Sequence, residues 1–319
     1  MLRYPDLSLL PLPILSLSIL LLAGTAHAAP DAQPFSIAET GQRFSSLADA
    51  VAAIGAGDGT IDIAPGIYRQ CAVQQAGRVA YRATTPGSVI FDGMACEGKA
   101  ALVLRGRAAH VQGLTFQNMR VADRNGSGIR LEAGNLAVVD SIFRASEQGI
   151  LTSDSPASQV HIDRVTFRQL GGCPNGMCSH SIYAGDVALA RISRSRFEAG
   201  TGGHYVKARA ARVEITDNSF DDSHGSATNY MIDLPAGATG LIARNVFAQG
   251  RFKENHSCFI AVGAEQQRHP SDGLTIAANQ AHLAPGTSWP TSFVANWTDA
   301  TLALSGNQLG AGIKPYDKR

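Results

Sequence analysis

The chain has 319 residues, of which 45% are hydrophobic and 17% are charged, and its formal net charge is +1. Nucleic-acid binders carry a basic excess that holds phosphates, so this near-neutral balance argues against a nucleic-acid partner. The 33 glycines are typical of a chain with many tight turns, because glycine adopts positive φ without steric cost.

The N-terminal residues predict an export signal. Arg3 precedes an apolar run over residues 7–23, and the small-x-small sequence Ala26-His27-Ala28 follows it. We therefore assign residues 1–28 to a signal peptide that is cleaved after Ala28. Two prolines interrupt the apolar run, which disfavours the alternative of a retained membrane anchor. The mature protein is expected in the periplasm or outside the cell, with no membrane span.

Export permits disulfides, because the compartments beyond the cytoplasm are oxidising. The five cysteines are Cys71, Cys96, Cys173, Cys178 and Cys258. Cys173 and Cys178 would close a short turn in CPNGMC, and Cys71 and Cys96 lie about one repeat apart, so both pairs are disulfide candidates. Zinc at CPNGMC, with His180 nearby, is the rival; a single pair at this spacing is not a usual zinc pattern, and we expect no metal.

A repeat runs through the chain from about residue 111. Six phenylalanines mark it at intervals of 27, 24, 30, 23 and 27 residues: Phe116, Phe143, Phe167, Phe197, Phe220 and Phe247. A second strand-like segment precedes each marker, and turn-forming residues cluster between the segments. Such periods with short strands predict a parallel β-helix, with one coil per repeat. A leucine-rich repeat is disfavoured because its regular leucine skeleton is absent.

Four asparagines occupy one position of the repeat: Asn218, Asn245, Asn279 and Asn307. Asparagine favours turns in general. Recurrence in four successive coils fits better with a hydrogen-bonded ladder inside the coil. In either case their role is structural.

The start of the mature chain predicts a helix over residues 44–54, with apolar residues at 44, 47, 51 and 54. Such a helix would cover the open end of the coil and protect its exposed edge. We therefore divide the mature chain into an N-terminal segment with this capping helix (29–60), a β-helix (61–310) and a C-terminal tail (311–319).

The stretch SLADAVAAIGAGDGTIDIAPGIY resembles the first coil of right-handed parallel β-helix proteins of the pectin-lyase-like superfamily. The resemblance extends over about residues 40–310. It implies an all-β fold, a single-stranded right-handed parallel β-helix. It implies no single activity, because the superfamily includes lyases, hydrolases, epimerases, phage tailspikes and adhesins.

Strand alternation predicts which side chains leave the coil. One outward column reads Arg130, Leu151, Tyr183, Lys207, Asp233 and Ala261. The same alternation sends Tyr205, Arg209 and Met231 outward. A second column, just before these strands, reads His180, His204, Tyr230 and Cys258, with Asn229 next to Tyr230. Since neighbouring coils lie one strand spacing apart, these side chains are expected to gather on one face.

This composition suits β-elimination from a uronate sugar, in which a base removes the proton next to a carboxylate whose charge is neutralised. Some β-helix lyases use a surface lysine and arginine, and HYVKAR resembles that arrangement. We expect Lys207 as the base, Arg209 as the carboxylate clamp, and Tyr230 or His204 as the acid. The residues expected to bind substrate are His180, Tyr183, Tyr205, Asn229, Asp233 and Arg130.

The expected activity is therefore a lyase acting on an acidic polysaccharide, without a cofactor. Alternatives are a C5-epimerase and a noncatalytic glycan-binding or surface protein. Lys207 and Asp233 could also be a simple cross-strand ion pair, and His180 and His204 could turn inward. Asp221 and Asp222 lack clear partners for a hydrolase, and no acidic cage for calcium is recognisable.

Overall fold

The computed structural model describes residues 32–173, 176 and 178–319. The predicted signal peptide lies outside these residues. Within them, no helix has the length and apolarity needed to cross a membrane.

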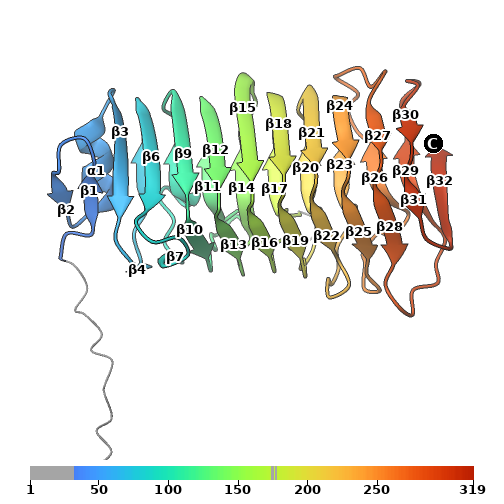
Figure 1. The fold of residues 1–319 in the computed structure, drawn as a ribbon, viewed down its shortest axis with the longest axis horizontal. Coiled ribbons are helices and arrows are strands. Elements are labelled where there is room, and N and C mark those ends of the chain that lie inside the picture. The colour runs from blue at the N-terminus through green and yellow to red at the C-terminus, as the bar shows by residue number, and fades with distance from the viewer. Residues whose placement is uncertain (1–31, 174–175, 177) are drawn as a thin grey trace, which may run out of the picture. The chain divides into compact units, whose positions relative to one another are not determined.

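The strands of the described residues form three sheets that run along one parallel β-helix (Figure 1). The first sheet contains β1 (Phe35–Ile37), β2 (Arg43–Phe44), β3 (Asp58–Ile63), β6 (Arg78–Ala83), β9 (Ala108–Gln112), β12 (Asn135–Val139), β15 (Ser155–Asp163), β18 (Val187–Ser193), β21 (Arg212–Thr216), β24 (Thr239–Ala243), β27 (Thr275–Ala277) and β30 (Ala303–Ser305). The second contains β4 (Gly66–Tyr68), β7 (Val89–Asp92), β10 (Leu114–Gln117), β13 (Ile142–Arg144), β16 (Thr166–Arg168), β19 (Arg196–Glu198), β22 (Ser219–Asp221), β25 (Val246–Gln249), β28 (Gln280–Leu283) and β31 (Gln308–Leu309). The third contains β5 (Ala72–Gln74), β8 (Ala100–Leu104), β11 (Ser127–Leu131), β14 (Gln148–Thr152), β17 (Ile182–Ala184), β20 (Val206–Ala208), β23 (Ile232–Leu234), β26 (Cys258–Val262), β29 (Thr291–Asn296) and β32 (Ile313–Lys318).

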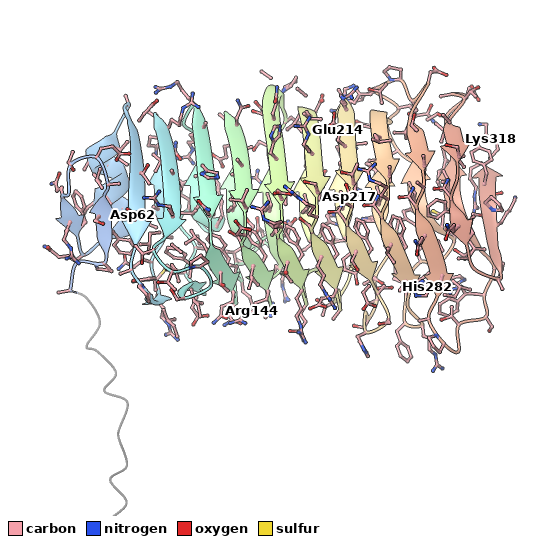
Figure 2. The ribbon with its side chains drawn as sticks, in the orientation of Figure 1. Asp62, Arg144, Glu214, Asp217, His282 and Lys318 are labelled. Atoms are coloured by element: carbon pink, nitrogen blue, oxygen red, sulfur yellow. A yellow bond between two sulfur atoms is a disulfide. The ribbon has the colours of Figure 1, made fainter. Side chains whose placement is uncertain are left out.

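Each coil adds one strand to each sheet, in parallel with the strand of the coil before it. The predicted parallel β-helix is thereby confirmed. The strand β32 continues the third sheet into residues for which the sequence predicts only a tail. Charged side chains such as Arg144, Glu214 and Asp217 lie on the outer surface (Figure 2).

A column of stacked phenylalanines fills the interior behind the second sheet. From Phe91 to Phe247, successive rings lie 4.7–5.6 Å apart and within 17° of parallel. All are buried. The regular phenylalanine spacing in the sequence therefore reflects one ring per coil, placed directly over its predecessor.

The asparagine ladder is confirmed. The backbone N–H of Asn218 donates to Asn245 Oδ1 (3.0 Å), that of Asn245 to Asn279 Oδ1 (3.0 Å), and that of Asn279 to Asn307 Oδ1 (3.1 Å). Each side-chain amide also bonds a backbone carbonyl of the preceding coil. These bonds satisfy buried backbone groups at the turns that precede four strands of the second sheet, β22, β25, β28 and β31.

The helix α1 (Leu47–Ile54) begins three residues later than predicted, because Ser46 caps it by accepting the N–H of Asp49. It buries Leu47, Ala50 and Val51 against the first coil. It lies at the N-terminal end of the solenoid, beside β1 (Figure 1).

Both predicted cysteine pairs form disulfides, Cys71–Cys96 and Cys173–Cys178. Cys258 is reduced and buried. Burial raises the pKa of its thiol to about 12, so this cysteine is an inert part of the packing.

Candidate functional site

The predicted outward column exists on the third sheet. Tyr183 of β17 pairs in register with Lys207 of β20, which pairs with Asp233 of β23. The flanking residues of β20, Val206 and Ala208, point into the core. Alternation in a short strand thus places Lys207 on the outer face.

Five side chains meet there, and we call them the Lys207 cluster: Tyr183, Lys207, Arg209, Asp233 and Glu265. The Lys207 ammonium lies 2.6 Å from Glu265 Oε1 and 3.4 Å from Asp233 Oδ2. Arg209 donates from Nε to the Tyr183 hydroxyl (3.0 Å), and its terminal nitrogen pairs with Glu265 Oε2. One carboxylate therefore spans both cations, in the way a bound anion would.

Glu265 was missed by the sequence analysis. It lies in the loop between β26 and β27, 58 residues beyond Lys207. Its backbone N–H donates to the carbonyl of Pro235, which anchors the loop over the preceding coil. No periodicity relates a loop residue to a strand column, so the sequence carries no signal for this contact.

Asp233 points outward as expected, but it is covered and only 3% exposed. Burial raises its pKa to about 6, although Lys207 opposes this shift. Its Oδ1 is buried without a hydrogen-bond partner. At pH 7 this carboxyl is mostly ionised, and it carries an unpaired buried oxygen.

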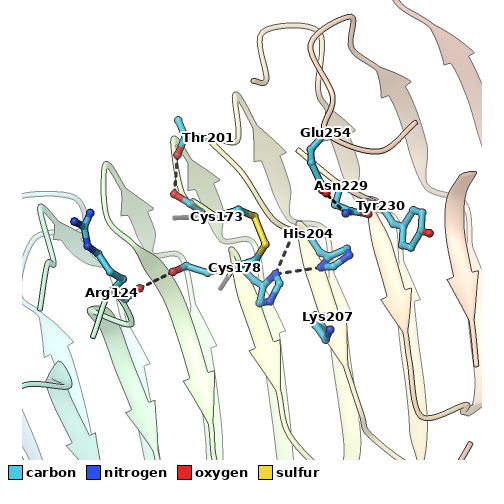
Figure 3. The surroundings of a disulfide bond; sticks show 12 residues. Arg124, Cys173, Cys178, Thr201, His204, Lys207, Asn229, Tyr230 and Glu254 are labelled. Atoms are coloured by element: carbon cyan, nitrogen blue, oxygen red, sulfur yellow. Dashed lines mark hydrogen bonds between the residues drawn. A yellow bond between two sulfur atoms is a disulfide. The ribbon is translucent and has the colours of Figure 1, made fainter. Parts of the chain in front are cut away.

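His180 and His204 are stacked, 4.9 Å between ring centroids, and nearly fully buried. The backbone N–H of His204 donates to His180 Nδ1 (3.0 Å). Burial lowers the pKa of His180 to about 3 and that of His204 well below its usual value. Both rings are therefore neutral at pH 7. They lie next to the cluster, His180 beside the Tyr183 ring (5.4 Å between centroids) and His204 Nε2 3.7 Å from Asp233 Oδ2. Figure 3 shows the Cys173–Cys178 disulfide on the same side of the coil as His204 and Lys207.

The prediction that Tyr205 faces substrate is wrong. Tyr205 is 2% exposed, and its hydroxyl donates to Asp222 Oδ1 (2.8 Å) and accepts the N–H of Gly200 (3.0 Å). It precedes the strand, at a bend, where the alternation does not apply. Met231 holds the same place in the next coil and is also buried, contrary to expectation.

Asp222 has partners that the sequence analysis did not find. Its Oδ2 lies 3.1 Å from the Lys253 ammonium, and both side chains are 1% exposed. Thr228, Tyr205 and the backbone N–H of Gly250 donate further hydrogen bonds to the carboxylate. This is an internal ion pair behind the sheet, with no access to a ligand.

The other predicted residues lie around the cluster rather than in it. The Tyr230 ring packs against the His204 ring, with 5.6 Å between the ring centroids, and its hydroxyl points away from Lys207 (Figure 3). Asn229 donates to Glu254. Arg130 bonds Ser153 (3.2 Å), and Leu151 separates it from Tyr183 in the column.

A groove of about 620 Å³ lies elsewhere, on the outer face of the first sheet. Small side chains such as Ala80 and Ala137 form its floor, with His110 and His161 beside them. Its rim carries Asp58, which pairs with Arg78 (3.7 Å) and with Arg107. These three side chains are more than half exposed, whereas Lys207 and Arg209 are 12% and 15% exposed. We take the Lys207 cluster as the candidate site. Among the described residues, no three His, Cys, Asp or Glu side chains gather closely enough to hold a metal ion.

No protein-family model matches the chain, and no curated protein matches it. Among solved structures, an alginate lyase from Paenibacillus sp. str. FPU-7 is similar with a TM-score of 0.59 at 15% identity, covering 85% of this chain and 96% of that one. ORF18 of Geobacillus virus E2 is similar with a TM-score of 0.55 at 12% identity, covering 86% and 56%. At such low identities these similarities establish only the fold, which is that of a parallel β-helix protein.

Proposed function

We propose that this protein is a polysaccharide lyase that cleaves an acidic, uronate-containing glycan by β-elimination. The observation that carries the proposal is the Glu265 carboxylate, which is bound by Lys207 and Arg209 together. A site that holds one carboxylate in this way is suited to hold the carboxylate of a uronate. The alginate lyase of similar fold supports an acidic polysaccharide as the substrate class.

In this mechanism Arg209 binds the uronate carboxylate and neutralises the charge that develops as the C5–H bond breaks. Lys207 begins as an ammonium ion, so it first passes one proton to the Asp233 carboxylate, which lies 3.4 Å away. The resulting amine then takes the C5 proton. The C4=C5 double bond forms, the C4–O bond breaks, and the leaving oxygen receives a proton. The product chain carries an unsaturated uronate at its new non-reducing end.

We assign the proton donor to Tyr183 instead of Tyr230 or His204. The Tyr183 oxygen accepts the Arg209 Nε–H (3.0 Å), so its own proton is free for the leaving oxygen. His204 is buried and neutral, and a neutral imidazole is a weak acid. Tyr230 points its hydroxyl away from Lys207.

Hydrolysis fits the cluster less well. A glycoside hydrolase places the sugar between two carboxyl groups. Here Asp233 and Glu265 both contact Lys207, so the ammonium occupies the space that a sugar would need. The two disulfides support an oxidising compartment for the reaction, outside the cell or in the periplasm.

Incubation with a panel of polyuronates tests the proposal. A lyase generates the ultraviolet absorbance of an unsaturated uronate. Solvent deuterium at C5 without chain cleavage would identify a C5-epimerase instead. Binding without any chemical change would leave a glycan-binding protein.

A further inference from the structure

Glu265 is held in place by its backbone, independently of its side chain. Its N–H donates to Pro235 O (3.1 Å), and the N–H of His269 donates to Ala236 O (2.9 Å). Farther along the loop, His269 Nε2 lies 3.1 Å from Asp186 Oδ1. The loop therefore stays over the third sheet whichever way the Glu265 side chain turns.

The Glu265 side chain is also the most exposed member of its ion pairs. It is 41% exposed, whereas Lys207 is 12% and Arg209 is 15% exposed. A ligand approaching from solvent meets Glu265 first, and the two cations lie beneath it. The cations cannot receive a second carboxylate in the same geometry while Glu265 occupies them.

The charges of the cluster balance. Two cations, Lys207 and Arg209, face two carboxylates, Asp233 and Glu265. Burial raises the pKa of Glu265, but hydrogen bonds from Lys207 and Arg209 outweigh it, and the net pKa lies below the usual value. Glu265 is therefore ionised at neutral pH, and the free site offers an incoming anion little net attraction.

We propose that Glu265 is an internal competitor for the uronate carboxylate: it fills the subsite between Lys207 and Arg209 in the free protein, and substrate binds by displacing it. This inference rests on the proposed function, because it takes the displacing group to be a uronate. The displaced side chain swings into solvent while its backbone stays anchored. The exchange keeps the two cations oriented before substrate arrives and selects for sugars that carry a carboxylate.

The substitution Glu265→Gln tests this directly, because it removes the charge and preserves the size of the side chain. The control is Glu214→Gln. Glu214 lies on the outer face of the first sheet (Figure 2), between Arg191 and Arg212, at 2.6 and 3.1 Å. Calorimetric titration with uronate tetrasaccharides prepared from alginate and from pectate gives the dissociation constants, with a neutral glucan tetrasaccharide as the ligand control.

We expect Glu265→Gln to bind at least one uronate tetrasaccharide about tenfold more tightly than the wild type, a gain of about 1.4 kcal/mol. The Glu214 variant should bind within twofold of the wild type, and affinity for the neutral glucan should not change. Unchanged or weaker uronate binding by Glu265→Gln, with the fold intact by circular dichroism, overturns the inference.

The binding and product measurements together distinguish failure of the competitor inference from failure of the proposed lyase activity. Tighter uronate binding by Glu265→Gln without any unsaturated product would keep the competitor and refute the lyase. Formation of unsaturated product, with uronate binding unchanged by Glu265→Gln, would support the lyase and refute the competitor. Absence of uronate binding by both proteins would refute both.

Discussion

Two lysines of this chain show how surroundings decide what a side chain does. Lys253 is 1% exposed and bonded to a buried carboxylate, so it belongs to the packing. Lys207 lies on the outer face, 12% exposed, and contacts two carboxylates and the ring face of Tyr183. Only Lys207 can reach a ligand, and our mechanism accordingly gives it the proton transfer.

Tyr205→Phe should lower the free energy of unfolding by about 1–3 kcal/mol, because the buried Gly200 N–H loses its acceptor and Asp222 loses a donor. Its effect on glycan binding should be negligible, since Tyr205 is inside the coil. Urea unfolding together with a glycan titration measures both. If the variant had normal stability but bound glycan more weakly, this prediction would be contradicted and Tyr205 would instead contact substrate.

The stacked histidines predict a pH dependence of stability. A histidine whose folded pKa is depressed contributes stability that is present above its unfolded pKa and is lost as the pH falls toward the folded value. For His180 this window runs from pH 6.5 down to about 3. Asp233, whose pKa is raised to about 6, opposes the trend, because its contribution is lost as the pH rises through that value.

We therefore expect acidification from pH 6.5 to about 4.5 to destabilise the wild type by about 2 kcal/mol more than His180→Gln. The readout is the difference between their unfolding free energies across the pH range, so a constant cost of the substitution cancels. Parallel profiles for the two proteins would contradict the neutral, buried state of His180.

At the scale of the element, one coil is a strand from each sheet joined by turns that carry the specific chemistry. The asparagine ladder is the clearest example, because each asparagine satisfies backbone groups of its neighbours. Asn245 is fully buried in the middle of the ladder, whereas Asn307 ends it and is half-buried. Water can replace the bonds of the second more easily than those of the first.

Asn245→Ala should accordingly destabilise the protein by about 2–4 kcal/mol, since the buried Asn218 N–H and Ile215 carbonyl both lose a bond. Asn307→Ala should cost about 1 kcal/mol. Chemical denaturation of the two variants compares them. Equal losses would mean that the asparagines reflect turn preference without a cooperative ladder.

At the scale of the whole molecule, the sequence predicts repetition well and exceptions poorly. Regular phenylalanines, alternating strands and recurring asparagines follow from one coil stacking on the next, and the Arg130 to Ala261 column follows from that register. The alternation does not predict the orientation of Tyr205, because this residue precedes its strand. Glu265 escapes because a loop two coils away brings it to Lys207. The disulfide pairs could be proposed from the export signal together with the spacing of the cysteines.

The repeated architecture also explains why the candidate site is confined to a few coils. Every coil offers the same three faces, but only the coils of β17, β20 and β23 bring Tyr183, Lys207 and Asp233 together, and one later loop closes over them. The scaffold can therefore be shared with proteins of other activities, and our proposal places the chemistry of this chain in the local cluster.

The most direct test of the central claim is the initial rate of unsaturated-uronate formation by the wild type and by Lys207→Met, on a polyuronate that the wild type cleaves. Arg212→Met, which changes an exposed cation on the first sheet, is the control. We predict a loss of about 100-fold or more for Lys207→Met and a normal rate for the control. A wild-type protein that forms no unsaturated product from any polyuronate, or a Lys207→Met variant with full activity, would contradict the account.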